Sequence, residues 1–195
     1  DGSFIYNADG SKQYDTSSSY LSNRNIAYEI RTDKDKNKRS VLDGQIYGKI
    51  SLPYGFNFTT KANFNHATNN RTRYSNPNIG DGASSNGRLN LYNFQYTTYT
   101  AQELLDWSHD FDVHHVDVLV GHENFSWKRK YDMVMNTNMA VPNNLTLGNF
   151  LNNATTEGYN DVYRTESYLT RIRYNYDERY FADFSYRRDG SSRLA

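Results

Sequence analysis

The chain has 195 residues, with 22 Lys or Arg against 22 Asp or Glu, so its formal net charge is zero and no overall field favours nucleic acid. It has no cysteine, which excludes disulfide scaffolds, thiolate nucleophiles and cysteine-based zinc sites. Aromatic residues reach 15%, with 18 Tyr and 10 Phe, within a hydrophobic fraction of only 36%. Few aliphatic side chains remain for a compact core, and Tyr suits half-wet sheets and membrane interfaces.

The two ends of the chain lead us to expect an internal fragment, from a truncated gene or a cut chain. Asp1-Gly2-Ser3 has neither the basic nor the apolar segment of a signal peptide, and a strand-like pattern still runs at Ala195. No run of about 18 apolar residues is present, which excludes a transmembrane helix.

Residues 1–40 are predicted to be a polar loop region. They are rich in turn formers, including the Ser/Thr cluster at 16–19, and contain a possible strand end at 26–30 and a charge-dense loop at 33–39. Residues 41–195 are predicted to form the second region, built of about six strands.

The first hairpin is predicted over residues 46–64. Its even positions are apolar, small or Thr and carry no charge, whereas Lys and Asn occupy odd positions. This alternation indicates strands, and Pro53-Tyr54-Gly55 indicates a tight turn between them.

The second hairpin is predicted over residues 89–135, after a long polar loop at 69–88. The alternation shifts phase within 89–110, which we interpret as β-bulges, and the residues from Gly121 to Asn124 break the phase again. A helix over residues 100–107 remains an alternative, because Thr100-Ala101-Gln102-Glu103 matches a capping box. A second long loop is predicted at 136–160.

The third hairpin is predicted over residues 163–186, with its turn at Asp177-Glu178-Arg179. Alternation divides its side chains into two sets on opposite faces. The set expected to face lipid is Ile172, Tyr174, Tyr180, Ala182, Phe184 and Tyr186. The set expected to face a polar lumen is Arg171, Arg173, Asp183 and Arg187.

Short turns at 53–55, 110–113 and 177–179 are expected at one end of the sheet, and the long loops at the other. Outer-membrane barrels have this asymmetry as a rule, with antiparallel strands, short periplasmic turns and long extracellular loops. The predicted fold class is therefore all-β: an antiparallel meander of long hairpins, forming a segment of a large transmembrane β-barrel.

Three sequence blocks resemble the SusC/RagA family of TonB-linked outer-membrane transporters of the Bacteroidetes. The most specific runs from Tyr168 to Tyr180, through Arg171-Ile172-Arg173-Tyr174-Asn175-Tyr176-Asp177, into Ser185-Tyr186-Arg187-Arg188-Asp189-Gly190-Ser191-Ser192-Arg193. The segment His114 to Glu123 and the turn Tyr54-Gly55-Phe56 are similar to two further family segments.

The resemblance implies a plugged barrel of about 22 strands in the cell outer membrane. Such a protein imports oligosaccharides (glycans) or peptides together with a SusD-like surface lipoprotein, driven by TonB acting on a plug. This chain contains no plug, so we expect that by itself it does not transport.

No catalytic, cofactor or metal site is expected. The adjacent His114 and His115 point to opposite faces of a strand, so at most one could join His122 at a metal. No hydrolytic constellation supports a soluble β-rich hydrolase, and nucleic acid is not an expected partner. Weak candidates for stacking on substrate are Tyr74, Tyr92 and Phe150. A secreted, non-catalytic β-sandwich that binds carbohydrate remains the alternative function.

Overall fold

The computed structural model describes residues 5–14 and 24–194, so the predicted loop cluster at 16–19 lies outside the described residues. Most of the described chain is β-strand, and helices are few. In chain order the elements are α1 (Ile26–Thr32), β1 (Lys34–Ser51), η1 (Pro53–Gly55), β2 (Phe56–Ser75), η2 (Gly80–Ser85), β3 (Arg88–Phe111), β4 (His114–Met139), η3 (Leu147–Asn149), β5 (Phe150–Tyr176) and β6 (Tyr180–Ser191).

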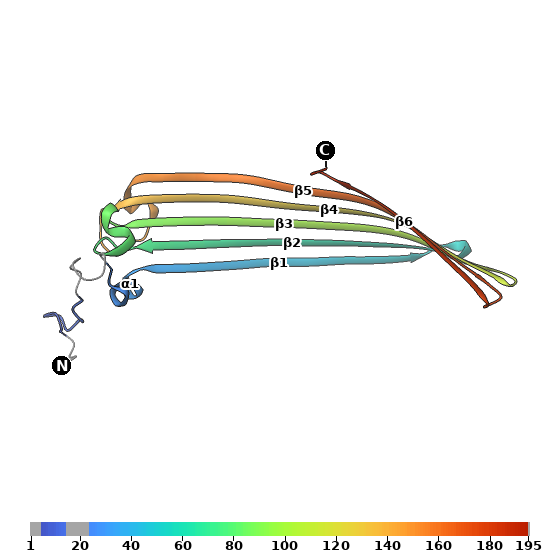
Figure 1. The fold of residues 1–195 in the computed structure, drawn as a ribbon, viewed down its shortest axis with the longest axis horizontal. Helices are drawn as coiled ribbons and strands as arrows, with labels where there is room; N and C mark the ends of the chain where they lie inside the picture. The colour runs from blue at the N-terminus through green and yellow to red at the C-terminus, as the bar shows by residue number, and fades with distance from the viewer. Residues whose placement is uncertain (1–4, 15–23, 195) are drawn as a thin grey trace. The chain divides into compact units, whose positions relative to one another are not determined.

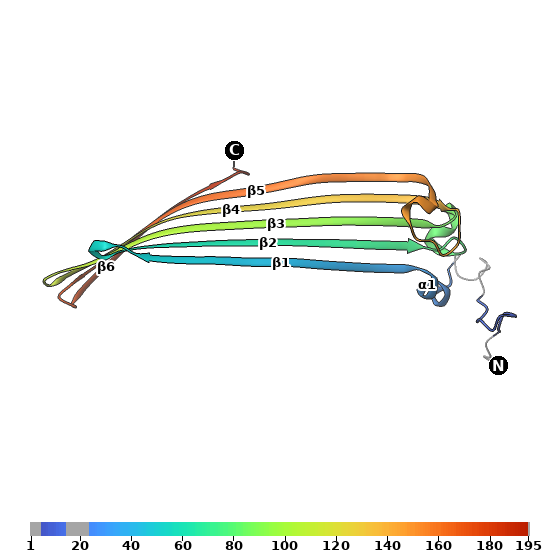
Figure 2. The same ribbon diagram turned by 180° about the vertical axis from the view of Figure 1, so that it is seen from behind.

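The strands form one sheet in the order β1-β2-β3-β4-β5-β6, so each strand pairs with its neighbours in sequence. Both ribbon views follow this order without a crossover (Figures 1 and 2). The predicted all-β antiparallel meander is confirmed. Of the described residues, none belongs to a helix with the length and apolar character needed to cross a membrane.

The chain divides into two compact units, each assembled from separate stretches of sequence. Unit 1 takes residues from 1–39, 69–94 and 131–159, and unit 2 takes residues from 40–68, 95–130 and 160–195. The buried apolar cluster of Tyr74, Leu89 and Phe150 lies in unit 1, with Leu145 and Leu147 packed against it. The predicted division of the chain into residues 1–40 and 41–195 stays a prediction.

Residues 26–30 form part of α1, and the prediction of a strand end there is wrong. Asn25 caps this helix, since its side-chain oxygen accepts a hydrogen bond from the backbone N–H of Tyr28 at 3.1 Å. The carboxylate of Glu29 accepts from the backbone N–H of Asn25 at 3.2 Å, which satisfies a second donor. The predicted loop at 33–39 is also wrong, because β1 begins at Lys34.

Both long loops are shorter than predicted. β2 continues to Ser75 and β3 begins at Arg88, so the connection is limited to residues 76–87. Similarly, β4 continues to Met139 and β5 begins at Phe150, which leaves a short connection in place of a loop over 136–160. Polar stretches can extend a sheet because the ladder is made by backbone groups, whatever the side chains.

Residues 100–107 belong to β3, so the strand is confirmed and the helical alternative is wrong. The contacts of β3 with β4 in unit 2 keep one register. Residues 96, 102, 103, 104 and 110 of β3 meet residues 129, 123, 122, 121 and 115 of β4 in turn. Each step forward on one strand is matched by one step back on the other, which leaves no room for an inserted residue. The prediction of bulges is therefore wrong for this part of β3 and β4. The apolar residues instead shift from one face of the strand to the other.

Candidate functional site

In the β5–β6 hairpin of unit 2, the two predicted sets of side chains, one charged and one apolar or aromatic, lie on opposite faces of the sheet. The register pairs Arg171 with Ser185, Ile172 with Phe184 and Arg173 with Asp183. Odd positions therefore pair with odd ones and even positions with even ones. Because neighbouring residues of a strand point to opposite faces, the two predicted sets lie on two different faces.

The charged face is defined by Arg171, Arg173, Asp183 and Arg187, with Asp117 of β4. The guanidinium of Arg171 donates to the carboxylate of Asp183, with a distance of 2.9 Å from Nε to Oδ2. Arg173 on β5 lies beside Asp117 on β4, at 3.4 Å between Nη2 and Oδ2. Each of these pairs is more than one-quarter exposed, so screening by water keeps its contribution to stability small.

Arg187 extends the same face towards β4. Its Nη2 lies 3.2 Å from Glu123 Oε1, and its Nε donates to Asp189 at 2.8 Å. Ser167 contributes its hydroxyl, which donates to Asp189 and accepts from Arg187 at 3.1 Å. Every cation of this stretch has an acidic partner, so the face is polar but locally neutral. Such a surface can hold water and polar solutes without attracting one sign of charge.

The aromatic face carries the other predicted set. Phe184 is 62% exposed and Tyr180 is 69% exposed, and Ile172, Tyr174 and Tyr186 are exposed as well. On β3 and β2, Trp107 packs against Phe56 at 6.1 Å between ring centres. Exposed apolar side chains on this scale mark a surface that contacts something other than water.

A polar row follows the aromatic stretch on the same face, at His122 of β4. Its Nδ1 lies 2.9 Å from Glu103 Oε2, and its Nε2 lies 3.1 Å from Glu166 Oε1. The ring also stacks on Tyr168, with 5.0 Å between the centres. Each ring nitrogen is thus occupied by a carboxylate.

A metal centre is not indicated by the geometry. Among residues 5–14 and 24–194 there is no group of three or more His, Asp or Glu side chains arranged to hold a metal ion. His114 and His115 do point to opposite faces: His114 stacks on Tyr174, whereas His115 lies 3.3 Å from Asp117 Oδ2.

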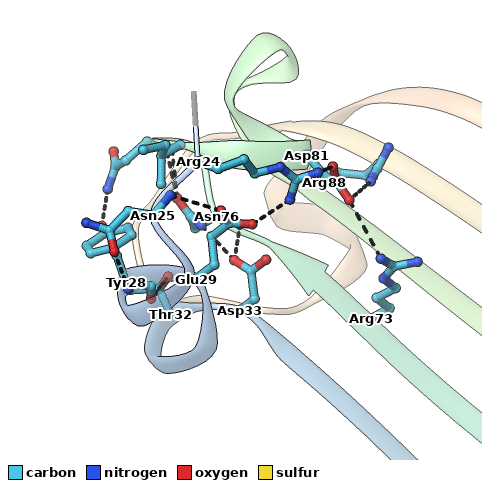
Figure 3. Close-up of polar contacts among 12 residues, drawn as sticks. Arg24, Asn25, Tyr28, Glu29, Thr32, Asp33, Arg73, Asn76, Asp81 and Arg88 are labelled. Atoms are coloured by element: carbon cyan, nitrogen blue, oxygen red, sulfur yellow. Dashed lines mark hydrogen bonds and ion pairs between the residues drawn. The ribbon is translucent and has the colours of Figure 1, made fainter. Parts of the chain in front are cut away.

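In unit 1, a network of polar contacts attaches α1 to the connection between β2 and β3 (Figure 3). Arg24 Nη1 donates to Glu29 Oε2 at 2.6 Å, and Arg24 also pairs with Asp81. The hydrogen bond to Glu29 and the charge of Asp81 raise the pKa of Arg24 above its ordinary value. Arg73 and Arg88 each lie 3.7 Å from Asp81. These contacts hold the connection between β2 and β3 in position, and the charged side chains of this network pair with one another.

Asn76 completes this network. Its backbone N–H and its side-chain amide both donate to Asp33 Oδ1, at 2.9 and 2.7 Å. Its own oxygen accepts from the backbone N–H groups of Asn78 and Ile79. Asn76 is almost fully buried, so these hydrogen bonds hold the loop in one conformation.

Two of the three residues proposed for substrate stacking are buried. Tyr74 is 8% exposed and Phe150 only 2%, and their rings meet edge to face at 6.2 Å. Neither ring has a free face for a ligand, since both belong to the apolar cluster of unit 1. Tyr92 is half-buried, and its contact with substrate stays a prediction.

Sequence reasoning missed two acidic residues that the structure brings to the charged face. Asp117 meets Arg173 and His115, and Glu123 meets Arg187. The available signal was the odd numbering of both residues in β4, and the assumed change of phase after Gly121 obscured it only for Glu123.

Comparisons with known proteins agree with the expected fold, and with nothing finer. No family model matches the chain, and no curated protein matches its sequence. A chain in the structure of the RagAB peptide transporter matches with a TM-score of 0.81 over 96% of this chain, at 16% identity. Two structures of the RagAB peptide importer, in the closed-closed and open-open states, each match with a TM-score of 0.75 over 84%, at 18% and 16% identity.

This chain covers 22% of the first of those chains and 18% of each of the other two, so it spans about a fifth of their length. The fold expected from the SusC/RagA resemblance, a segment of such a barrel, is confirmed by these matches.

Proposed function

We propose that this chain, which has the fold of a segment of a RagAB transporter chain, forms part of the wall of an outer-membrane transporter of the SusC/RagA kind. In this arrangement the aromatic face of unit 2 contacts outer-membrane lipid, and the charged face lines a polar lumen. Arg171, Arg173, Asp183 and Arg187 are the lumen-facing residues.

The observation that carries the proposal is the separation of the charged and the aromatic set onto opposite faces of the β5–β6 hairpin in unit 2. In water, the exposed rings of Tyr180 and Phe184 would gain by leaving the solvent, at about 25 cal/mol per Å² of apolar surface. In a membrane the same face is already in its preferred surroundings, while backbone groups must be paired between strands. A sheet that closes on itself through β1 and β6 with further strands meets both requirements.

The transported substrate is proposed to be a peptide, because the matched structures are described as a peptide transporter and peptide importer. Oligosaccharide import, which the sequence resemblance left open, is the second candidate. A SusD-like lipoprotein at the extracellular side and TonB acting through a plug are the proposed partners. This chain contributes strands of the barrel wall, and other parts of the transporter supply the plug and the energy coupling.

The carbohydrate-binding β-sandwich is less well supported. A sandwich needs a second sheet over the apolar face. In the described residues the even positions of β1 are uncovered, with Ile46 75% and Ile50 59% exposed.

The test compares two neighbouring lysine substitutions, one on each face. Phe184→Lys on the aromatic face is expected to weaken insertion of the chain into phosphatidylcholine vesicles by about 2–4 kcal/mol, because a charge then enters the hydrocarbon. Ser185→Lys on the charged face is the matched control and is expected to insert like the unmodified chain. Insertion is measured by flotation of the vesicles with bound chain.

Equal insertion by the two variants would contradict the assignment of faces. If the unmodified chain stays behind as a soluble monomer while the vesicles float, the sandwich alternative is favoured instead.

A further inference from the structure

The turn between β1 and β2, in unit 2, holds a tyrosine in a backbone conformation that tyrosine seldom adopts. Tyr54 has φ 64° and ψ 27°, which is the left-handed region. Among the described residues, seven residues other than glycine have a positive φ, and five of them are Asn or Asp. Those two types tolerate the left-handed region because their short polar side chains can hydrogen-bond locally, whereas a bulky residue there is an outlier.

The contacts around the turn fix this conformation. The backbone N–H of Leu52 donates to the carbonyl oxygen of Phe56 at 2.8 Å and closes the turn. The indole N–H of Trp107 donates to the carbonyl oxygen of Tyr54 at 2.9 Å. A Cβ atom at Gly55 would lie 2.5 Å from a backbone oxygen of β3, so the turn rests directly on that strand. The fold thus imposes the left-handed conformation on whichever residue occupies position 54.

The side chain of Tyr54 contributes little to the folded chain. It is 87% exposed, and its ring and hydroxyl make no ring contact or hydrogen bond with another described residue. An Asn at this position would fit the backbone better and would expose less apolar surface to water. A strained residue whose side chain points into solvent indicates a contact outside the chain.

Aromatic side chains surround this turn at the ends of the neighbouring strands. Phe56 is the first residue of β2, and Phe111 is the last of β3. Between ring centres, Trp107 lies 6.1 Å from Phe56 and 6.3 Å from Phe111. Two positions farther from the turn, the exposed aliphatic side chains Ile50 and Leu105 follow on the same face. Aromatic rings that border an aliphatic stretch are typical of a membrane interface.

We propose that Tyr54 anchors the β1–β2 turn in the headgroup layer of a phospholipid bilayer. The inference rests on the proposed function, which places the aromatic face towards lipid. Tyr suits this layer because its ring is apolar and its hydroxyl is polar. Burial of the ring in the bilayer offsets a backbone cost that nothing within the described chain offsets. The edge of the membrane on the side of the short turns then lies at Tyr54.

The first test locates the ring. Tyr54→Trp keeps an aromatic ring at the turn, and its added fluorescence is expected to be quenched by phosphatidylcholine that carries a spin label at the headgroup. The matched control is Tyr47→Trp, at an exposed odd position of β1 on the opposite face, whose added fluorescence is expected to remain unquenched. Both are measured on chain that floats with the vesicles, and the unmodified chain supplies the signal of Trp107 and Trp127.

A second comparison separates the ring from the backbone. Tyr54→Ala removes the ring and keeps the left-handed cost, whereas Tyr54→Asn removes both. Both variants are expected to bind phosphatidylcholine vesicles about fivefold more weakly than the unmodified chain, as for the loss of about 40 Å2 of buried ring surface. In maltoside micelles, Tyr54→Asn is expected to unfold at a higher urea concentration than Tyr54→Ala.

Vesicle binding by Tyr54→Ala equal to that of the unmodified chain overturns the anchor, and equal urea midpoints for the Ala and Asn variants overturn the role of strain. Chain that floats while the ring at position 54 stays unquenched overturns this inference and leaves the proposed function standing. Chain that does not float with the vesicles overturns both.

Discussion

At the scale of single residues, Gly82 shows how tightly the β2–β3 connection is folded. It is buried in η2, and a Cβ atom there would lie 2.5 Å from the carbonyl oxygen of Ser75 and closer still to that of Asn76. Neither oxygen belongs to a side chain that could rotate away, so the backbone itself would have to shift. The absence of a side chain is thus required by close approach at this position.

Gly82→Ala is expected to lower the free energy of unfolding by about 1–3 kcal/mol, since the added methyl overlaps backbone atoms. Gly148→Ala is the control, because a Cβ atom at Gly148 meets nothing within 4 Å. Urea unfolding in micelles, followed by tryptophan fluorescence, compares the two variants. Equal unfolding midpoints would mean that the connection is looser than described.

At the scale of elements, the β5–β6 hairpin is closed by a turn whose residues adopt an uncommon conformation. Asp177 has φ 48° and Glu178 has φ 54°, and the backbone N–H of Arg179 donates to Tyr176 at 2.9 Å. Positive φ at both central positions is the pattern of a type I′ turn, which matches the twist of paired strands. Residues with a Cβ atom adopt it at a cost, and glycine does not.

Glu178→Gly is therefore expected to stabilise the hairpin by about 0.5–1 kcal/mol. This value is the relief of backbone strain in the folded state minus the cost of the greater conformational entropy of glycine in the unfolded state. Glu157→Gly, within β5, is the control and is expected to destabilise by about 0.5–1 kcal/mol. Amide hydrogen exchange along β6 reports the change. Faster exchange in the Glu178→Gly variant would contradict this account of the turn.

At the scale of the whole molecule, the strand order leaves β1 and β6 at the two edges of the sheet. Each edge strand presents backbone donors and acceptors on one side that pair with no strand of the described chain. In a segment of a barrel wall, those donors and acceptors form hydrogen bonds with further strands. In the isolated chain they offer a template for pairing with another copy.

The isolated chain in micelles is expected to self-associate increasingly with concentration, as measured by sedimentation. Ser185→Pro and Tyr186→Pro form a matched pair, because successive N–H groups of β6 point to opposite sides of the strand. One variant removes a donor from the free edge and lowers self-association. The other breaks a hydrogen bond to β5 and lowers stability. A chain that remains monomeric at all concentrations would contradict the role of the edges.

Sequence periodicity by itself determined which segments are strands near the short turns, and which side chains share a face. A strand repeats every two residues, so Ile172 and Phe184 were separable from Arg171 and Asp183 without a structure. The turns at 53–55 and 177–179 were predictable for a related reason, since Pro, Gly and clustered polar residues interrupt that repeat.

Only the tertiary structure decided where the strands end and which side chains meet. β2 runs on to Ser75 through polar residues because its hydrogen bonds are made by the backbone, and exposed polar positions leave no alternating signal. The seven residues of α1 are too few for a clear helical period. Burial of Tyr74 and the pairing of Asp117 with Arg173 follow from cross-strand register, which joins residues far apart in sequence and is not encoded in the local pattern of either strand.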